Sequence, residues 1–116
     1  MKLKVRKSPL HGRGLFASKA IPWGTKIIEY TGEAIPDDVA EERIARGADC
    51  IFELRQGENI DGAVNGNEAR YVNHARRRPN CFILREDGKI WIVAGIEGIK
   101  NGEELTFDYG SGFYPR

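Results

Sequence analysis

The sequence predicts a mostly β domain built from small curved sheets, with one or two short helices. Candidate strands are short, and the turns between them draw on 14 glycines. Only one segment has the charge and capping pattern of a good helix. Hydrophobic residues make up 41% of the chain and charged residues 30%, which is typical of a globular protein. The 116 residues fit one domain, residues 1–116.

The first third of the chain predicts strands that are separated by tight turns. Residues 2–6 (KLKVR) predict a short edge strand, which Ser8-Pro9 ends, and HGRG then forms a turn. Two further strands are expected at 15–18 and 26–30, on either side of a Pro-Trp-Gly turn.

The middle of the chain holds the one good helix candidate, residues 37–46. Pro36 and Asp37 begin it, acidic residues fill its first turn, and Gly47 ends it. Its apolar stripe is thin. The remaining elements expected here are strands at 50–54 and 59–61 and one helical turn at 68–72.

The clearest local element is a hairpin near the C-terminus. CFILRE and KIWIVA flank Asp87-Gly88, a dipeptide suited to a two-residue type I′ turn. A loop at 98–102 and a last short strand at 105–109 follow. Short strands joined by irregular loops favour a site made from loops.

Charge is unevenly distributed, although the net charge is only +1. Residues 1–28 carry seven basic side chains and no acidic one, whereas residues 29–61 carry ten acidic side chains against three arginines. The acidic segment is either a solvated surface or an attraction for a basic partner. Direct contact with nucleic acid is not expected, because the net charge is near zero and the basic third lacks interleaved aromatics.

The cysteines and the apolar stretches restrict location and metal binding. Cys50 and Cys81 cannot make a zinc quartet, and with two histidines they show no zinc spacing, so no metal is expected. The N-terminus has no apolar leader, and the longest apolar stretch, 90–96, is too short for a membrane span. A cytoplasmic location is expected, or a nuclear one for a eukaryotic, viral or effector protein.

Four motifs follow one another along the chain. They are HGRGLFA (11–17), IEYTGE (28–33), RYVNHARRRPNC (70–81) and GEELTFDYG (102–110). In order and spacing they resemble the SET domain family of protein lysine methyltransferases. The resemblance covers almost the whole chain. It implies a SET-like fold with a C-terminal pseudoknot, and S-adenosylmethionine as the methyl donor.

The resemblance also implies a donor-binding set. It consists of His11, Gly12, Arg13, Gly14, Arg70, Asn73, His74, Tyr109 and Phe113. Glycines in the turn lack a Cβ that would obstruct close approach of the donor. The Asn73 side chain offers both an acceptor and donors. His74 is then a binding residue rather than a catalytic base; the alternative is a core histidine.

Tyr109 matches the family's catalytic tyrosine, and it would orient the reacting groups. The resemblance places Tyr30 and Phe107 along the channel for the lysine side chain, where aromatic walls exclude water. A phenylalanine at position 107 leaves room that favours di- or trimethylation. Core packing is the alternative for both residues.

The chain also departs from the family pattern. Many relatives have NHSC followed closely by PN and then a cysteine-rich, zinc-binding tail, whereas this chain has NHARRRPNC and the tail SGFYPR. Phe113 or Tyr114 could close over the donor or the channel instead. A homodimer is another way to complete a site that a short tail leaves open. The expected substrate is a basic, lysine-containing protein, histone-like or ribosomal. Two rivals remain: an inactive SET-fold binding module and a small β-rich nucleic-acid-binding domain.

Overall fold

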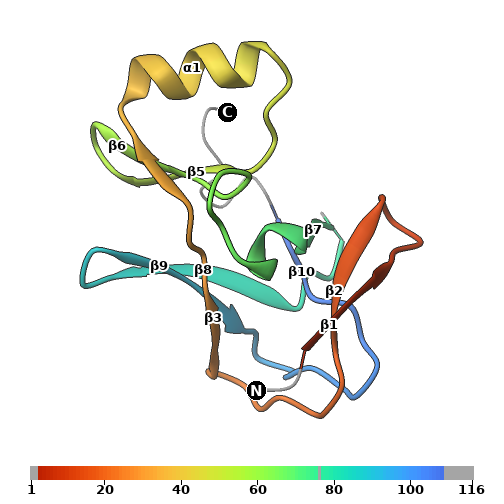
Figure 1. Cartoon of the computed structure of the whole chain (residues 1–116). Coiled ribbons are helices and arrows are strands. Elements are labelled where there is room, and N and C mark those ends of the chain that lie inside the picture. The colour runs from red at the N-terminus through yellow and green to blue at the C-terminus, as the bar shows by residue number, and fades with distance from the viewer. Residues whose placement is uncertain (1–2, 76, 109–116) are drawn as a thin grey trace.

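The computed structural model describes residues 3–75 and 77–108 and confirms the mostly β fold class (Figure 1). Ten short strands and two short helices follow one another in these residues. They are β1 (Leu3–Lys7), β2 (Arg13–Ala17), β3 (Lys26–Glu29), β4 (Glu33–Ile35), α1 (Asp37–Ala45), β5 (Ile51–Arg55), β6 (Glu58–Asp61), the 3-10 turn η1 (Glu68–Tyr71), β7 (Asn73–His74), β8 (Cys81–Glu86), β9 (Lys89–Ala94) and β10 (Thr106–Phe107).

The strands form four small sheets within the described residues. β1 pairs with β2, β10 with β7, β9 lies between β3 and β8, and β6 lies between β4 and β5. The predicted hairpin is confirmed, since β8 and β9 pair from Cys81↔Ala94 to Glu86↔Lys89. Asp87 and Gly88 have φ of 55° and 72°, the left-handed values that a type I′ turn requires.

The structure differs from the sequence expectation in several strands. β2 begins at Arg13 and ends at Ala17, instead of covering the expected 15–18. β4 and β7 were not expected, because each has only two or three residues and exists through its partner strand. The last strand is shorter than the expected 105–109, with Thr106 and Phe107 pairing to β7. Local sequence cannot show such pairings, since the strands come from distant segments.

The main core lies beneath the β3–β9–β8 sheet. Ile27, Ile90 and Ile92 of this sheet are buried, and Leu15 and Leu105 pack into the same cluster from β2 and the approach to β10. This core therefore joins the N-terminal hairpin to the C-terminal motif.

Helix α1 has a smaller core of its own. Ile35, Ala40 and Ile51 are buried between the helix and the β4–β6–β5 sheet, and Figure 1 shows the helix above β5 and β6. Arg43 of α1 pairs with Glu33 at 2.8 Å and with the buried Asp61 at 3.0 Å. Paired in this way, Asp61 attaches the helix to β6.

β10 pairs in parallel with β7, with Thr106 opposite Asn73 and Phe107 opposite His74. The C-terminal motif therefore lies beside the Asn-His pair, although about thirty residues separate them in the chain. This pairing is the described part of the expected pseudoknot, and residues 109–116 lie outside the described residues.

Three aromatic rings join the core across the sheets. Tyr30 stacks on Phe52 with centroids 4.6 Å apart, and Phe52 lies 5.2 Å from Phe107. Phe52 comes from β5 and is 2% exposed, so it connects the sheet under α1 to β10.

We predict that Phe52→Ala lowers the free energy of unfolding by about 3–5 kcal/mol, because it leaves a cavity between two rings. Phe82→Ala is the matched control. Phe82 is 39% exposed, so its loss should cost less than about 2 kcal/mol. Urea unfolding of both variants measures the difference, and equal losses would contradict the central place of Phe52.

Candidate functional site

One cavity gathers most of the described residues that the sequence predicts for donor binding. Its volume is about 300 Å³. It is lined by His11, Gly12, Arg13, Asp49, Cys50, Ala63, Arg70, Tyr71 and Asn73. These residues come from four separate stretches of the chain, and five of them belong to the predicted set. We call this cavity the candidate donor site.

The two glycines of HGRG have different structural roles. Gly12 lies in the turn before β2, whereas Gly14 lies in β2 itself and pairs with Arg6, so the turn is shorter than expected. Gly12 has φ of 46°, and a Cβ there would meet nothing within 4 Å, so it faces open space. Gly14 is buried, and a Cβ there would collide with the Glu104 carboxylate, whose Cδ would lie 2.8 Å away. Gly12 fits the expected approach of a ligand, whereas Gly14 makes room for Glu104.

The side-chain amide of Asn73 fastens the HGRG turn to β7. Its Nδ2 donates to the carbonyl oxygens of His11 at 3.1 Å and Arg13 at 2.9 Å, and to Glu104 Oε2 at 2.8 Å. Three acceptors around Nδ2 fix the orientation of the amide. The other amide atom of Asn73, Oδ1, accepts no hydrogen bond from the described residues. It remains available to an N–H or O–H group of a bound ligand.

Glu104 is a site residue that the sequence analysis missed. Its two carboxylate oxygens accept from Ser8 Oγ at 2.9 and 2.8 Å, in addition to the bond from Asn73. Ser8 Oγ in turn accepts from Leu10 N at 2.9 Å. The carboxylate thus connects the start of the turn, the Asn-His strand and the C-terminal motif. The signal was present in GEELTFDYG, but its partners are 31 and 96 residues away.

Asn80, the Asn of the Pro-Asn pair, is a second missed residue. Its Nδ2 donates to the Glu104 carbonyl oxygen at 2.8 Å, and its Oδ1 accepts from Thr106 N at 2.8 Å. Asn80 therefore fixes the backbone on both sides of Leu105, including the residue that carries the Glu104 carboxylate.

His74 and Arg70 occupy different positions relative to the cavity. His74 is half-buried, and its Nδ1 lies 3.9 Å from Asp108 Oδ1; it does not line the candidate donor site. Arg70 lines it and lies over the Tyr71 ring at 4.8 Å. Its Nη2 donates to the Tyr71 hydroxyl at 2.7 Å, and this bond raises the Arg70 pKa.

The predicted channel residues Tyr30 and Phe107 lie together in the core. They are 3% and 2% exposed, and Phe52 separates their rings. The Tyr30 hydroxyl donates to the Cys50 carbonyl oxygen at 2.8 Å, so it also supports the wall of the candidate donor site. Tyr109, Phe113 and Tyr114 lie outside the described residues, and their roles stay predictions.

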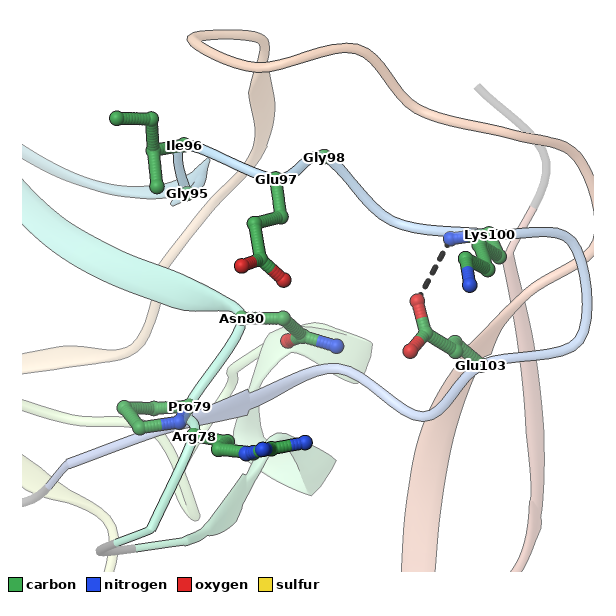
Figure 2. Close-up of a pocket in the computed structure, with 9 residues that line it drawn as sticks. All are labelled: Arg78, Pro79, Asn80, Gly95, Ile96, Glu97, Gly98, Lys100 and Glu103. Atoms are coloured by element: carbon green, nitrogen blue, oxygen red, sulfur yellow. Dashed lines mark hydrogen bonds between the residues drawn. The ribbon is translucent and has the colours of Figure 1, made fainter.

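A second, larger cavity lies elsewhere and holds none of the predicted residues. It measures about 520 Å³ between the loop before β8 and the loops that join β9 to β10. Figure 2 shows Arg78, Glu97, Lys100 and Glu103 around it, with Glu103 accepting from Lys100 N at 2.7 Å. Size alone favours this cavity as a site. We favour the smaller cavity, because five of its residues are ones that the sequence predicts for donor binding. The larger cavity has exposed side chains of both charges and none of the predicted residues.

The acidic segment is partly structural. Asp61 is 2% exposed and serves Arg43 and the Ala63 amide, so it is not part of an acidic surface. The exposed carboxylates of α1 are those of Asp38, Glu41 and Glu42, and Glu42 is paired with Arg46 at 3.2 Å. An acidic surface therefore exists, but it is smaller than the sequence count suggests.

Comparison with known proteins identifies the family. The profile of the SET domain matches residues 12–110. The chain belongs to the SET domain family. It is 37% identical over 113 residues to histone-lysine N-methyltransferase trithorax of Drosophila virilis, and 36% identical over 113 residues to histone-lysine N-methyltransferase 2B of Homo sapiens. These matches cover 90% of this chain but only 3% and 4% of those proteins.

Solved structures agree with this assignment. The autoinhibited ctPRC2 complex bound to S-adenosylmethionine has a chain with 36% identity and a TM-score of 0.83, covering 97% of this SET domain and 16% of that chain. A humanized mutant of the Chaetomium thermophilum Polycomb Repressive Complex 2, bound to the inhibitor GSK126, gives 38% identity and the same score, covering 98% and 15%.

The candidate donor site suits the amino-acid end of S-adenosylmethionine. Arg13 and Arg70 supply positive charge for a carboxylate. Asn73 Oδ1 and the exposed Asp49 supply acceptors for an ammonium group. The open space at Gly12 lets a ligand reach the backbone. The residues present therefore fit this group.

We predict that Gly14→Ala and Glu104→Ala are energetically coupled. Each destabilises the wild type: the first by a collision worth about 1–3 kcal/mol, the second by leaving Asn73 and Ser8 without their acceptor. In the double variant the collision with the carboxylate is gone, so a coupling of at least about 1 kcal/mol is expected. Gly12→Ala serves as the control, since it should not couple to Glu104→Ala. Additive losses at Gly14 would contradict the arrangement.

We predict that the Cys50 thiol reacts slowly although it lines the cavity. Burial, with Asp49 nearby, raises the pKa of Cys50 from 9.0 to about 11, and burial raises that of Cys81 to about 12. Below pH 9 the folded protein should hold about 100-fold less Cys50 thiolate than the unfolded chain.

Iodoacetamide alkylation of Cys81→Ala, folded and in urea, measures the Cys50 rate between pH 7 and 10. The raised pKa also stabilises the fold below pH 9, and this contribution is lost as pH rises from about 9 to about 11. Equal alkylation rates in the two states would show that the thiol is not protected.

Proposed function

We propose that this SET domain transfers methyl groups from S-adenosylmethionine to a lysine side chain of a basic protein. The carrying observation is the cavity that brings the HGRG turn, Arg70 and Asn73 together. The family assignment and the histone-lysine N-methyltransferase names of its relatives support the same reaction.

The residues of the candidate donor site would bind and orient the methyl donor. His11 to Gly14 supply the turn, and Asn73 presents Oδ1 because its Nδ2 is already occupied. His74 would contact the remainder of the donor with Phe113, and Gly14 contributes indirectly by admitting Glu104. When bound, S-adenosylmethionine supplies a methyl group activated by a positively charged sulfur.

The lysine amine must lose its proton before it can accept a methyl group. Its ordinary pKa of about 10.4 makes this cost roughly 4–5 kcal/mol at pH 7. Apolar surroundings and a nearby positive charge both lower that pKa. Tyr30 and Phe107 provide buried aromatic surface next to β10. Tyr109 is the second residue after β10. Its hydroxyl would orient the amine, and such positioning supplies much of the rate.

A basic protein is the substrate class that the charge distribution supports. The exposed carboxylates Asp38, Glu41 and Glu42 on α1 would attract the positive charges that flank a target lysine. A histone-like or ribosomal protein has that character. The resemblance places Phe107 along the lysine channel, and on that ground we propose di- or trimethylation.

Assembly and location complete the proposal. A homodimer, in which a second copy contributes to the candidate donor site, is also part of the proposal. A cytoplasmic or nuclear location suits Cys50 and Cys81, which are free thiols. No helix among the described residues is both long and apolar enough to cross a membrane.

We predict that Asn73→Ala weakens S-adenosylmethionine binding by about tenfold or more. The variant lacks the hydrogen bonds from Asn73 to the His11 and Arg13 carbonyl oxygens, and it lacks the Oδ1 acceptor that would bind the methyl donor. Calorimetric titration measures this, and urea unfolding checks that the variant is folded. Asn101→Ala, in an exposed turn, is the control and should bind as the wild type does. Unchanged S-adenosylmethionine binding in a folded Asn73→Ala variant would show that the methyl donor does not bind in this cavity.

We predict that Tyr109→Phe keeps donor binding, because the aromatic ring that would contact the donor is retained. It lowers methyl transfer by about 10- to 100-fold, the effect of one lost hydrogen bond. Methyl incorporation into a panel of basic peptides and lysate proteins measures the transfer. Donor binding by the wild type without transfer to any acceptor would favour an inactive SET-fold binding module.

A further inference from the structure

The N-terminal hairpin concentrates positive charge on one exposed edge. Lys4, Arg6 and Lys7 of β1 are exposed, as is Lys19 just beyond β2. We call these four residues the basic ribbon; Arg13 on the facing strand is also exposed but belongs to the candidate donor site. No carboxylate forms an ion pair with any of them within the part of the chain that the structure describes.

The ribbon is open along the edge of β1. β1 pairs only with β2 among the described strands, whereas β2 is covered on its far side by the segment before β10. The carboxylates on that far side are occupied: Glu104 by Ser8 and Asn73, and Glu103 by the Lys100 amide. The cations of β1 thus lack local compensation.

Like charges also face each other at the end of the hairpin. Lys7 is paired in register with Arg13, with no anion between them in the described structure. Two cations directly opposite across an antiparallel pair destabilise the sheet. An external anion along the edge would remove this repulsion.

The geometry points to a site for the phosphate backbone of duplex DNA on the basic ribbon. Lys4 to Lys7 extend over roughly 10 Å, alongside a polymer that carries one negative charge per about 1.7 Å of its axis. The guanidinium of Arg6 lies 4.4 Å from the centroid of the Phe16 ring, which holds it in place. Contacts of this kind read charge and not sequence.

A duplex fits better than a single strand. Single-stranded binders stack unpaired bases on exposed aromatic rings. Phe16 is the aromatic residue of the hairpin, and it is only 9% exposed under Arg6. The sequence expectation against nucleic acid relied on the net charge of the whole chain and on the lack of interleaved aromatics. The second argument applies to a single strand and not to the backbone of a duplex. The fold separates the charges, since Figure 1 shows the β1–β2 hairpin well away from α1, the helix that carries the exposed carboxylates.

The proposal goes beyond methyl transfer and does not depend on it. It would allow the domain to contact DNA through one end while the acidic end faces a basic, DNA-bound protein. Edge-strand lysines also discourage aggregation between sheets, so the test must separate these two roles.

Fluorescence anisotropy with a 24-base-pair duplex of random sequence tests the proposal between 50 and 200 mM KCl. Four phosphate contacts predict that affinity falls by about 150-fold over this range. Replacing Lys4, Arg6 and Lys7 together by Gln should leave a fall of only about 3.5-fold, with weaker binding at low salt. Replacing Lys4 and Lys7 by Arg should preserve the wild-type dependence.

The matched control replaces Arg46, Arg55 and Lys89 by Gln, which changes the net charge equally at exposed positions elsewhere. It should bind the duplex as the wild type does. Sedimentation and donor titration check assembly and folding of every variant. Three outcomes would overturn the proposal: no salt-dependent binding by the wild type, equal loss in the two triple variants, or tighter binding of a single strand. Self-association of the β1 variant with unchanged DNA affinity would show that the cations only protect the edge.

Discussion

The Glu104 carboxylate is the interaction on which the candidate site depends. It accepts from Ser8 and Asn73, and it occupies the space that a side chain at position 14 would take. Hydrogen bonds to a charged group contribute about 1.5–3 kcal/mol each, so this cluster holds the HGRG turn against β7 independently of any ligand. Because the turn is already ordered, binding of the methyl donor loses less free energy to ordering of the protein.

The strand pairing around the site holds this carboxylate in position. The β10–β7 pairing and the Asn80 bonds on either side of Leu105 fix the backbone that presents Glu104. The buried Leu105 attaches that backbone to the main core. One short segment therefore connects the main core to the wall of the candidate donor site. The site itself is made largely of loops, and the strands and the core hold these loops in position.

Much of the fold could be predicted from local sequence. The Asp87-Gly88 hairpin and helix α1 carry their own turn and capping signals. β4 and β7 carry none, because they form only against partners distant in the chain. The same limit applies to the site. Motif resemblance indicated the HGRG turn, Arg70 and Asn73, but not that Gly14 serves Glu104, nor that Asp61 is a buried ion-pair partner rather than part of an acidic surface.

The central claim is that the cavity bounded by the HGRG turn and Asn73 binds the methyl donor. A crystal structure of the protein with S-adenosylmethionine tests it most directly. We expect the donor's amino-acid end between Gly12 and Asn73 Oδ1, with the Glu104 bonds to Ser8 and Asn73 unchanged. A donor bound instead in the larger cavity beside Arg78 and Lys100, or a turn rearranged away from Glu104, would contradict the account.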